Sequence, residues 1–365
     1  LWMQKLPRTL ETLYLSPWVL AGSPLLLENL PPNLTMFGRK DAKSNLIQQP
    51  DWECNLPPSL FDSLVHYTWV HPAKNFATTI SHFSSLESLD ISGFTISGKQ
   101  IQLLPTSLRS LRFRAGYDVV ARAKTPKGKR YKASALENAD LARLPRSLTR
   151  LSICNLKRES VEFLSLLPQS ITSLALYEVE GAWDLVNDLA DFNKGCLPHI
   201  RHFEFQAKRS SSSTVQIRLS SLSWVPCATL HTLKLEFENI SIVCPETLLE
   251  TWPKGLPNRI AALALIGPWT VPLTPYLAAH LPPTLTQLEM PHFNQFVMPK
   301  EFLGKCPRSL TSCTIVKPSE YYNDGIINEL AWKEHDLLIL TPNYAAKDLD
   351  RLSTNVFAPP QLRYL

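Results

Sequence analysis

Glycine is scarce in this chain, and several sequence motifs of enzymes are missing from it. Only 12 of the 365 residues are glycine, and none of the motifs GxxxxGK[ST], GxGxxG or GxSxG occurs. These motifs cradle phosphates or present a nucleophilic serine. The zinc-protease motif HExxH is absent as well. We therefore expect a protein that is not an enzyme and that has no catalytic, cofactor-binding or metal site.

Paired cysteines and long apolar runs are also lacking. The seven cysteines form an odd set without a CxxC pair, whereas secreted disulfide frameworks favour even, clustered spacing. No apolar run approaches the roughly 20 residues of a membrane-spanning helix. We therefore expect a cytoplasmic protein without a membrane span. The nucleus is the alternative, because KTPKGKR at residues 124–130 loosely resembles a nuclear-localisation tract.

Proline, in contrast, is abundant, with 30 residues, and it recurs within one motif. The motif L-P-x-x-L-x-x-L-x-L is clearest in LPRTLETLYL from Leu6, LPTSLRSLRF from Leu104, LPRSLTRLSI from Leu144 and LPPTLTQLEM from Leu281. The anchoring prolines lie at 7, 31, 57, 105, 145, 168, 198, 226, 257, 282, 307 and 360, mostly 23 to 31 residues apart. Prolines that recur at fixed intervals indicate a repeat structure.

Two weaker segments complete the repeat pattern. FSSLESLDI from Phe83 fills the gap between the prolines at 57 and 105, and DLLIL from Asp336 fills the gap between those at 307 and 360. The result is about fourteen units of about 25 residues, within the range of leucine-rich repeats. We therefore predict an α/β fold in which residues 1–365 form a single leucine-rich-repeat solenoid, or horseshoe.

The motif also predicts the structure of each unit. In L-x-x-L-x-L, the last two leucines alternate as the buried face of a short strand does. Proline fixes φ and lacks an N–H, so it ends one unit and starts the next. Stacked units would form a concave parallel sheet with short helices or irregular turns on the convex side. The leucines expected to be buried include Leu13, Leu15, Leu111, Leu151, Leu174, Leu233, Leu263 and Leu288.

These units resemble leucine-rich repeats of the LPxSL type, and especially the FNIP repeats of amoebozoan and some giant-virus proteins. The nearest stretch is residues 281–299, where Phe293-Asn294-Gln295 stands near the FNxPI segment of that family. The asparagine that usually follows L-x-x-L-x-L is mostly replaced here. The resemblance implies a protein–protein interaction scaffold that binds its partner on the concave face. It also implies a role as the recognition part of a larger assembly, such as a ubiquitin-ligase adaptor.

The chain ends suggest a larger context. The terminal units of a solenoid need polar caps, and neither end of this sequence shows one. We therefore expect the chain to be a fragment of a longer protein.

Positive charge is concentrated in one segment. Residues 112–132 hold eight basic residues and one acid, whereas the rest of the chain holds 29 basic and 31 acidic residues. Most of this segment lies in a long insertion at residues 115–138. A second insertion, at residues 206–218, is rich in serine and is expected to be a loop. The basic insertion is either a solvated loop or part of a site for nucleic acid or another polyanion.

The candidate partner-binding residues follow from these patterns. A polyanion or an acidic protein would contact Arg112, Arg114 and Arg150 on neighbouring strands, together with Lys127, Lys129 and Arg130 of the insertion. If these residues do not bind, the mixed surface around Lys234, Glu236 and Glu289 is the alternative site for a protein partner.

Overall fold

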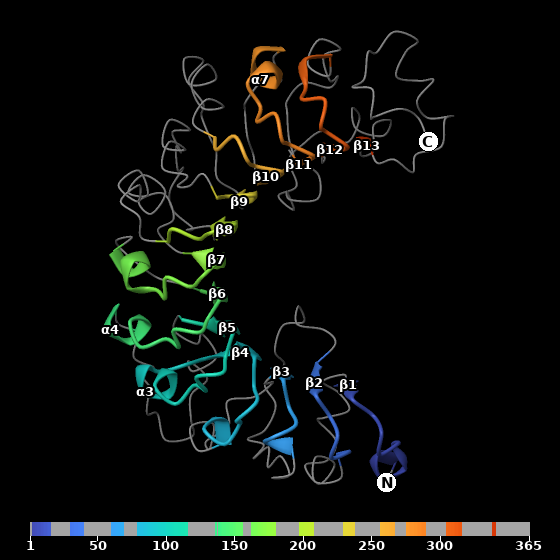
Figure 1. The fold of residues 1–365 in the computed structure, drawn as a ribbon, viewed down its shortest axis with the longest axis vertical. Helices are drawn as coiled ribbons and strands as arrows, with labels where there is room; N and C mark the ends of the chain where they lie inside the picture. The colour runs from blue at the N-terminus through green and yellow to red at the C-terminus, as the bar shows by residue number, and fades with distance from the viewer. Residues whose placement is uncertain are drawn as a thin grey trace, which may run out of the picture. The chain divides into compact units, whose positions relative to one another are not determined.

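The structure is a computed structural model in which short strands alternate with turns and a few short helices (Figure 1). It describes residues 2–15, 30–39, 60–68, 79–115, 136, 138–155, 162–179, 197–207, 229–237, 256–266, 275–289, 304–315 and 338–340.

The chain divides into two compact units. Unit 1 comprises Leu1–Lys157 and Glu162–Leu176, and unit 2 comprises Arg158–Val161 and Tyr177–Leu365. The strands of unit 1 are β1 (Thr12–Leu15), β2 (Met36–Arg39), β3 (His66–Thr68), β4 (Ser88–Thr95), β5 (Ser110–Arg114) and β6 (Arg150–Cys154). Strand β7 (Ser173–Val179) contains the division between the units. Unit 2 has β8 (His202–Ala207), β9 (Thr232–Phe237), β10 (Ala262–Ile266), β11 (Gln287–Glu289), β12 (Ser312–Ile315) and β13 (Leu338–Leu340).

Strands lie side by side in chain order within each unit. Strands β1 to β6 are parallel to one another, and so are β8 to β12. The L-x-L pattern explains this arrangement, because corresponding leucines of successive units pair in register. Leu89 pairs with Leu111 and Leu111 with Leu151, and these three side chains are at most 2% exposed. The predicted solenoid with a parallel sheet is thus confirmed.

Short helices lie on the side of each unit away from the strands. In unit 1 these are α3 (Gly98–Ile101) and α4 (Asn138–Leu141), and in unit 2 α7 (Pro275–Ala279) (Figure 1). The 3-10 helices η1 (Trp2–Lys5) and η5 (Glu162–Leu166) are equally short. Short helices between the strands are thus observed, as the motif predicts.

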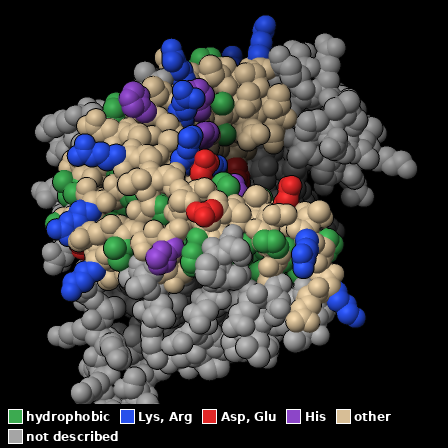
Figure 2. Space-filling view, turned by 60° about the horizontal axis from the view of Figure 1, so that its bottom comes forward, with side chains coloured by type: hydrophobic (Ala, Val, Ile, Leu, Met, Phe, Trp, Pro, Cys, Tyr) green, Lys and Arg blue, Asp and Glu red, His purple; other side chains and the backbone are tan. Residues whose placement is uncertain are grey.

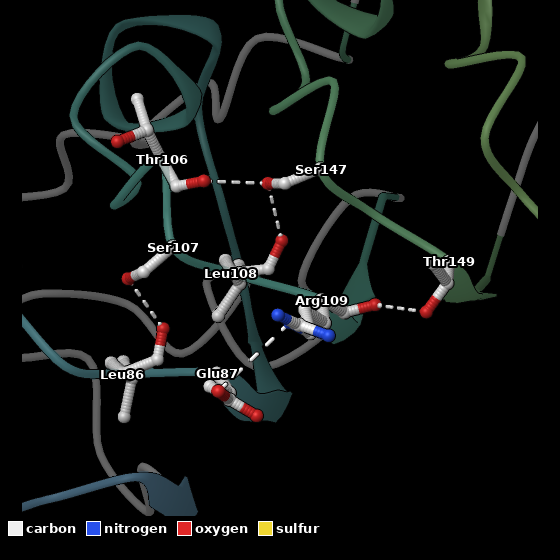
Figure 3. Close-up of polar contacts among 8 residues, drawn as sticks. All are labelled: Leu86, Glu87, Thr106, Ser107, Leu108, Arg109, Ser147 and Thr149. Carbon is white, nitrogen blue, oxygen red and sulfur yellow. Dashed lines mark hydrogen bonds and ion pairs between the residues drawn. The ribbon is translucent and has the colours of Figure 1, made fainter.

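A ladder of hydroxyl groups joins successive repeats (Figure 3). The hydroxyl of Ser147 lies 2.6 Å from the carbonyl oxygen of Thr106 and 2.7 Å from that of Leu108, both in the preceding repeat. Serine or threonine makes the same contact in other repeats, at Ser107, Ser170, Thr229, Thr284 and Ser309. Each of these residues directly precedes the second apolar residue of its motif, and all except Thr229, whose repeat has one extra residue, occupy the fourth position of L-P-x-S-L. Their hydroxyls thus satisfy backbone carbonyls between units, as backbone acceptors require.

The third repeat shows that the strand position expected from its proline was wrong. The proline at 57 predicts a strand that begins near Asp62, but β3 begins at His66, two residues after the buried Leu64. Leu60 therefore takes the place that the motif assigned to Leu56. The physical reason is that His66–Thr68 turns Tyr67 into the core, whereas Asp62–Leu64 offers no alternating apolar pair.

The segment at Asp336 does not extend the repeat as predicted. Strand β13 runs antiparallel to β12, whereas successive repeat units give parallel strands. The last predicted unit, from Pro359, lies outside the described residues.

The buried leucine columns are confirmed with one exception. Leu13 is only partly buried, because β1 pairs with β2 and no described strand covers its other edge. The burial of Leu15 lies outside what the structure describes.

The two predicted insertions are described mainly at their ends. Ala115 is 5% exposed and its N–H donates to the carbonyl oxygen of Cys154, while Leu136 is 2% exposed. Both ends of the basic insertion therefore pack against unit 1. Gln206 and Ala207 belong to β8, and residues 208–218 lie outside the described residues.

Candidate partner-binding surface

The candidate site lies on the sheet surface that the buried leucines face away from, which we call the open face. Every second strand residue points there because side chains alternate along a strand. The third residues of successive strands form a row within each unit. This row comprises Tyr14, Gly38, Thr68, Asp90, Arg112 and Ser152 in unit 1, and Glu204, Lys234, Ala264 and Glu289 in unit 2.

Unit 1 gathers charged and polar groups on β4, β5 and β6. We call Asp90, Arg112, Arg114, Ser152 and Cys154 the arginine cluster. Arg112 pairs in register with Asp90 on one side and Ser152 on the other, and Arg114 pairs with Cys154. Nη1 of Arg112 lies 4.0 Å from Oδ2 of Asp90, a separation longer than a hydrogen bond. The Nε atoms of both arginines are buried against the sheet.

Cys154 lies at the base of the arginine cluster. Its side chain is 7% exposed. Burial raises the pKa of the thiol above its usual 9.0, while the charge and hydrogen bond of Arg112 and the charge of Arg114 oppose that rise. The thiol is therefore protonated at neutral pH, and both guanidinium groups are close enough to influence it.

The structure brings together only part of the predicted basic site. Arg112 and Arg114 lie on the open face of β5, as predicted. Arg150 is exposed on the neighbouring β6, but it pairs with Ser110. It therefore lies one row away from Arg112, about 6.6 Å along the strand. Lys127, Lys129 and Arg130 lie outside the described residues.

Unit 2 carries a second group of polar side chains, which we call the glutamate network: Tyr177, Glu204, Gln206, Lys234 and Glu236. The ammonium group of Lys234 lies 2.7 Å from Oε1 of Glu204 and 3.4 Å from Oε2 of Glu236. The hydroxyl of Tyr177 donates to Oε2 of Glu204 at 2.6 Å, and Nε2 of Gln206 donates to Oε1 of Glu236 at 3.0 Å. The network thus spans β7, β8 and β9.

Lys234 is held in its charged form by this network. Burial favours the neutral amine, but the hydrogen bonds and negative charges of Glu204 and Glu236 together outweigh burial and raise the pKa of Lys234 above 10.5. Of the predicted mixed surface, Lys234 and Glu236 are therefore in contact. Glu289 occupies the same row on β11, with Ala264 of β10 between it and Lys234.

The sequence did not predict which side chains contact Arg112, Arg114 and Lys234. The alternation of the motif predicts that Asp90, Ser152, Tyr177 and Glu204 lie on the exposed side of the sheet, but it does not show which side chains they meet. The signal that would have found them is the strand register, since residues at the same position of neighbouring units lie side by side.

Figure 2 shows one face of the molecule, on which basic, acidic and hydrophobic side chains are interspersed and the hydrophobic groups stand apart from one another. No described residues form a group of three or more histidine, cysteine or acidic side chains that could hold a metal ion. In the described part of the chain, no helix has the length and apolar character needed to cross a membrane.

Comparison with known proteins gives structural neighbours only. No protein-family model matches the chain, and neither does any curated protein sequence. Solved structures with a similar fold include CroV588, described as a circular leucine-rich-repeat protein, and the leucine-rich-repeat-containing protein LegL7 from Legionella pneumophila. The chain has a leucine-rich-repeat fold. Its own period, parallel strands and buried leucine columns are the basis for this statement.

These neighbours are distant. CroV588 is 19% identical, with a TM-score of 0.39. The match covers 80% of this chain but only 35% of CroV588. LegL7 is 14% identical, with a TM-score of 0.43 over 96% of this chain and 92% of its own. The internalin InlF from Listeria monocytogenes is 14% identical, with a TM-score of 0.41 over 80% of this chain and 71% of its own.

Proposed function

We propose that this protein is a non-catalytic scaffold that binds a protein partner on the open face of unit 1. The observation that carries the proposal is the charge on β4, β5 and β6. Three arginines and one aspartate on this face, Arg112, Arg114, Arg150 and Asp90, give it a net charge of +2. Side chains of these strands cover this face and provide the recognition, and an acidic partner surface is complementary to their net positive charge.

The glutamate network of unit 2 supports the choice of unit 1. There, one lysine contacts two glutamates, so the positive charge is neutralised within the protein itself. A protein partner would gain less electrostatic attraction on that surface. Lys234, Glu236 and Glu289 remain the alternative site, for a contact that depends little on salt.

A photo-crosslinking experiment tests the proposal. A crosslinking amino acid is placed at Ser110, on the open face of β5, and as a matched control at Gln102, which is exposed at the end of α3. We expect a defined partner from an extract of the source cells to crosslink at Ser110 and not at Gln102. The purified partner should then bind the wild type at least tenfold more tightly than the Arg150→Glu variant. Crosslinking at Gln102 alone, or equal affinity of the variant, would reject the open face of unit 1.

Binding of nucleic acid or another polyanion is a second candidate function. It is favoured by the three arginines and by the basic residues of the insertion at 115–138. It is opposed by Glu87, which is ion-paired with Arg109 at 3.9 Å, and by Asp90 beside Arg112, because a continuous row of phosphates would pass these acids. A salt titration with a single-stranded oligonucleotide separates the candidates, since phosphate contacts give a steep decrease of affinity with salt.

The wider role of the scaffold stays a prediction. The family resemblance suggests the recognition part of a larger assembly, such as a ubiquitin-ligase adaptor. A cytoplasmic location, with the nucleus as the alternative, is likewise a proposal from the sequence.

A further inference from the structure

The arginine cluster has the geometry of a site for a single oxyanion. We propose that it binds a phosphoryl group carried by a serine, threonine or tyrosine of the protein partner. This inference rests on the proposed function, because it names the chemistry of the partner that the open face would recognise.

The positions of the donor groups support a tetrahedral ligand. Arg112 and Arg114 are two residues apart on β5, about 6.6 Å along the strand, and their register partners Ser152 and Cys154 lie on β6, about 4.8 Å away. Four side chains thus surround one area of about 5 by 7 Å. A planar carboxylate is matched by one guanidinium, whereas phosphate oxygens point in several directions and can accept from two guanidinium groups and a hydroxyl together.

Both arginines are held close to the sheet surface. Their Nε atoms are buried, and the Arg112 guanidinium is close enough to Cys154 to oppose the rise in the pKa of that thiol. A guanidinium group has five N–H donors, so it can contact the thiol and an incoming anion at once. Arginines that are already positioned lose less conformational entropy when a ligand binds.

The hydroxyl of Ser152 gives an independent indication of a ligand. Its Oγ is buried and makes no hydrogen bond within the protein, although buried hydroxyls are normally paired. Ser152 is the register partner of Arg112, so its hydroxyl lies beside the guanidinium groups. A phosphoryl oxygen at this place would accept from Ser152 and from the arginines.

The charge of the surface also matches a phosphate monoester. Arg112, Arg114 and Arg150 with Asp90 give a net charge of +2, and a phosphorylated side chain carries about −1.5 to −2 at pH 7. A carboxylate would neutralise only half of this charge. The corresponding row in unit 2 lacks this property, because Lys234 there contacts two glutamates.

The test measures binding of small anions to the full chain by calorimetry. Phosphoserine is the probe, and glutamate is the comparison anion with the same backbone groups. We expect phosphoserine to bind at least tenfold more tightly than glutamate at pH 7. Its affinity should fall below about pH 6, where the phosphate loses its second negative charge.

Variants locate the binding site. Arg114→Gln should weaken phosphoserine binding at least tenfold. Ser152→Ala should weaken it about threefold while leaving the melting temperature unchanged or higher, because it removes a buried hydroxyl that has no hydrogen bond. The matched control is Arg109→Gln, at an exposed arginine beside β5 that is paired with Glu87; its affinity should equal that of the wild type. The behaviour of Ser152→Ala keeps the test valid if Arg114→Gln does not fold.

Two results would overturn the proposal. One is equal affinity for phosphoserine and glutamate, and the other is a loss in Arg109→Gln as large as that in Arg114→Gln. Tight, salt-sensitive binding of an oligonucleotide without phosphoserine binding would also replace it, with the polyanion alternative. A failure of the phosphoryl site would leave the crosslinking at Ser110 intact, so it is distinguishable from a failure of the proposed function.

Discussion

At the scale of single residues, a serine or threonine hydroxyl connects several repeats to the repeat before them. Ser147 stands between the exposed Arg146 and the buried Leu148, and its hydroxyl lies within 2.7 Å of two carbonyl oxygens of the preceding repeat. Serine at this position therefore links neighbouring units through their backbones.

Replacing Ser147 by alanine should lower the free energy of unfolding by about 1 kcal/mol, because carbonyl oxygens lose their hydrogen-bond donor. Ser147→Thr should retain most of the stability, since Thr229 and Thr284 make the same contact in their own units. Urea unfolding of both variants measures the difference. Equal destabilisation by alanine and threonine would show that the hydroxyl contributes nothing.

Lys234 should stabilise unit 2 in a pH-dependent manner. Its pKa in the folded chain is raised above 10.5, so its contribution is fully present below the unfolded value of 10.5 and is lost as pH rises through the folded pKa. We expect Lys234→Met to be about 1 kcal/mol less stable than the wild type at pH 7, and the difference to shrink above pH 10.5. Urea unfolding between pH 7 and pH 12 provides the measurement, and a constant difference would contradict it.

At the scale of the strand, stability should depend on how many neighbours a strand has. Leu111 lies on β5, between β4 and β6, and is 1% exposed. Leu111→Ala should therefore cost about 2–5 kcal/mol. Leu13→Ala is the matched control, because Leu13 holds the same motif position on β1 but is only partly buried, and we expect it to cost less than half as much. Equal costs in urea unfolding would reject this reasoning.

The repeat motif made the strands and their inward leucines predictable. Wherever L-x-x-L-x-L is intact, as at Leu230, Leu233 and Leu235, the strand and its buried face follow from the alternation. The motif fails at the third repeat, where Pro57 stands four residues too early for the strand at His66. Proline alone does not fix the register, because burial of the following apolar pair decides which residues form the strand.

The side-chain contacts on the open face were harder to predict than the face on which each residue lies. Glu204 contacts Lys234, 30 residues later, and Tyr177, 27 residues earlier. These spacings differ because the connections between strands differ in length. The pairing of β4 with β5 also shifts between Ile91 and Thr95, so the neighbour of Arg114 could not be obtained by counting. The sequence therefore predicts which face a residue occupies more readily than which residue it meets.

At the scale of the whole molecule, the two units provide separate reporters of local opening. Cys154 is buried in unit 1 and Cys306 in unit 2. Burial raises the pKa of the Cys306 thiol to about 12 and that of Cys154 above 9.0, so both thiols are protonated and covered in the folded chain. Either thiol should react with an alkylating reagent mainly when its unit opens.

A destabilising change in one unit should therefore act mainly on its own cysteine. In the Leu111→Ala variant, alkylation of Cys154 should accelerate at least tenfold, while that of Cys306 changes less than threefold, because each repeat contacts only its neighbours. Peptide mapping by mass spectrometry after timed alkylation measures both rates in one sample. Equal acceleration would show that the units open together.

The hydroxyl ladder also bears on how such a chain can grow by duplication. A repeat with serine at this position supplies a donor to the repeat before it and presents its own carbonyl acceptors to the repeat after it, as Ser107, Ser147 and Ser170 do. A duplicated segment of one full period therefore carries a donor and an acceptor set with it, wherever the copied segment begins. A tandem duplication of such a repeat would form the same contact at its one new junction without a compensating mutation, so gain or loss of whole periods is the kind of change that this backbone tolerates best.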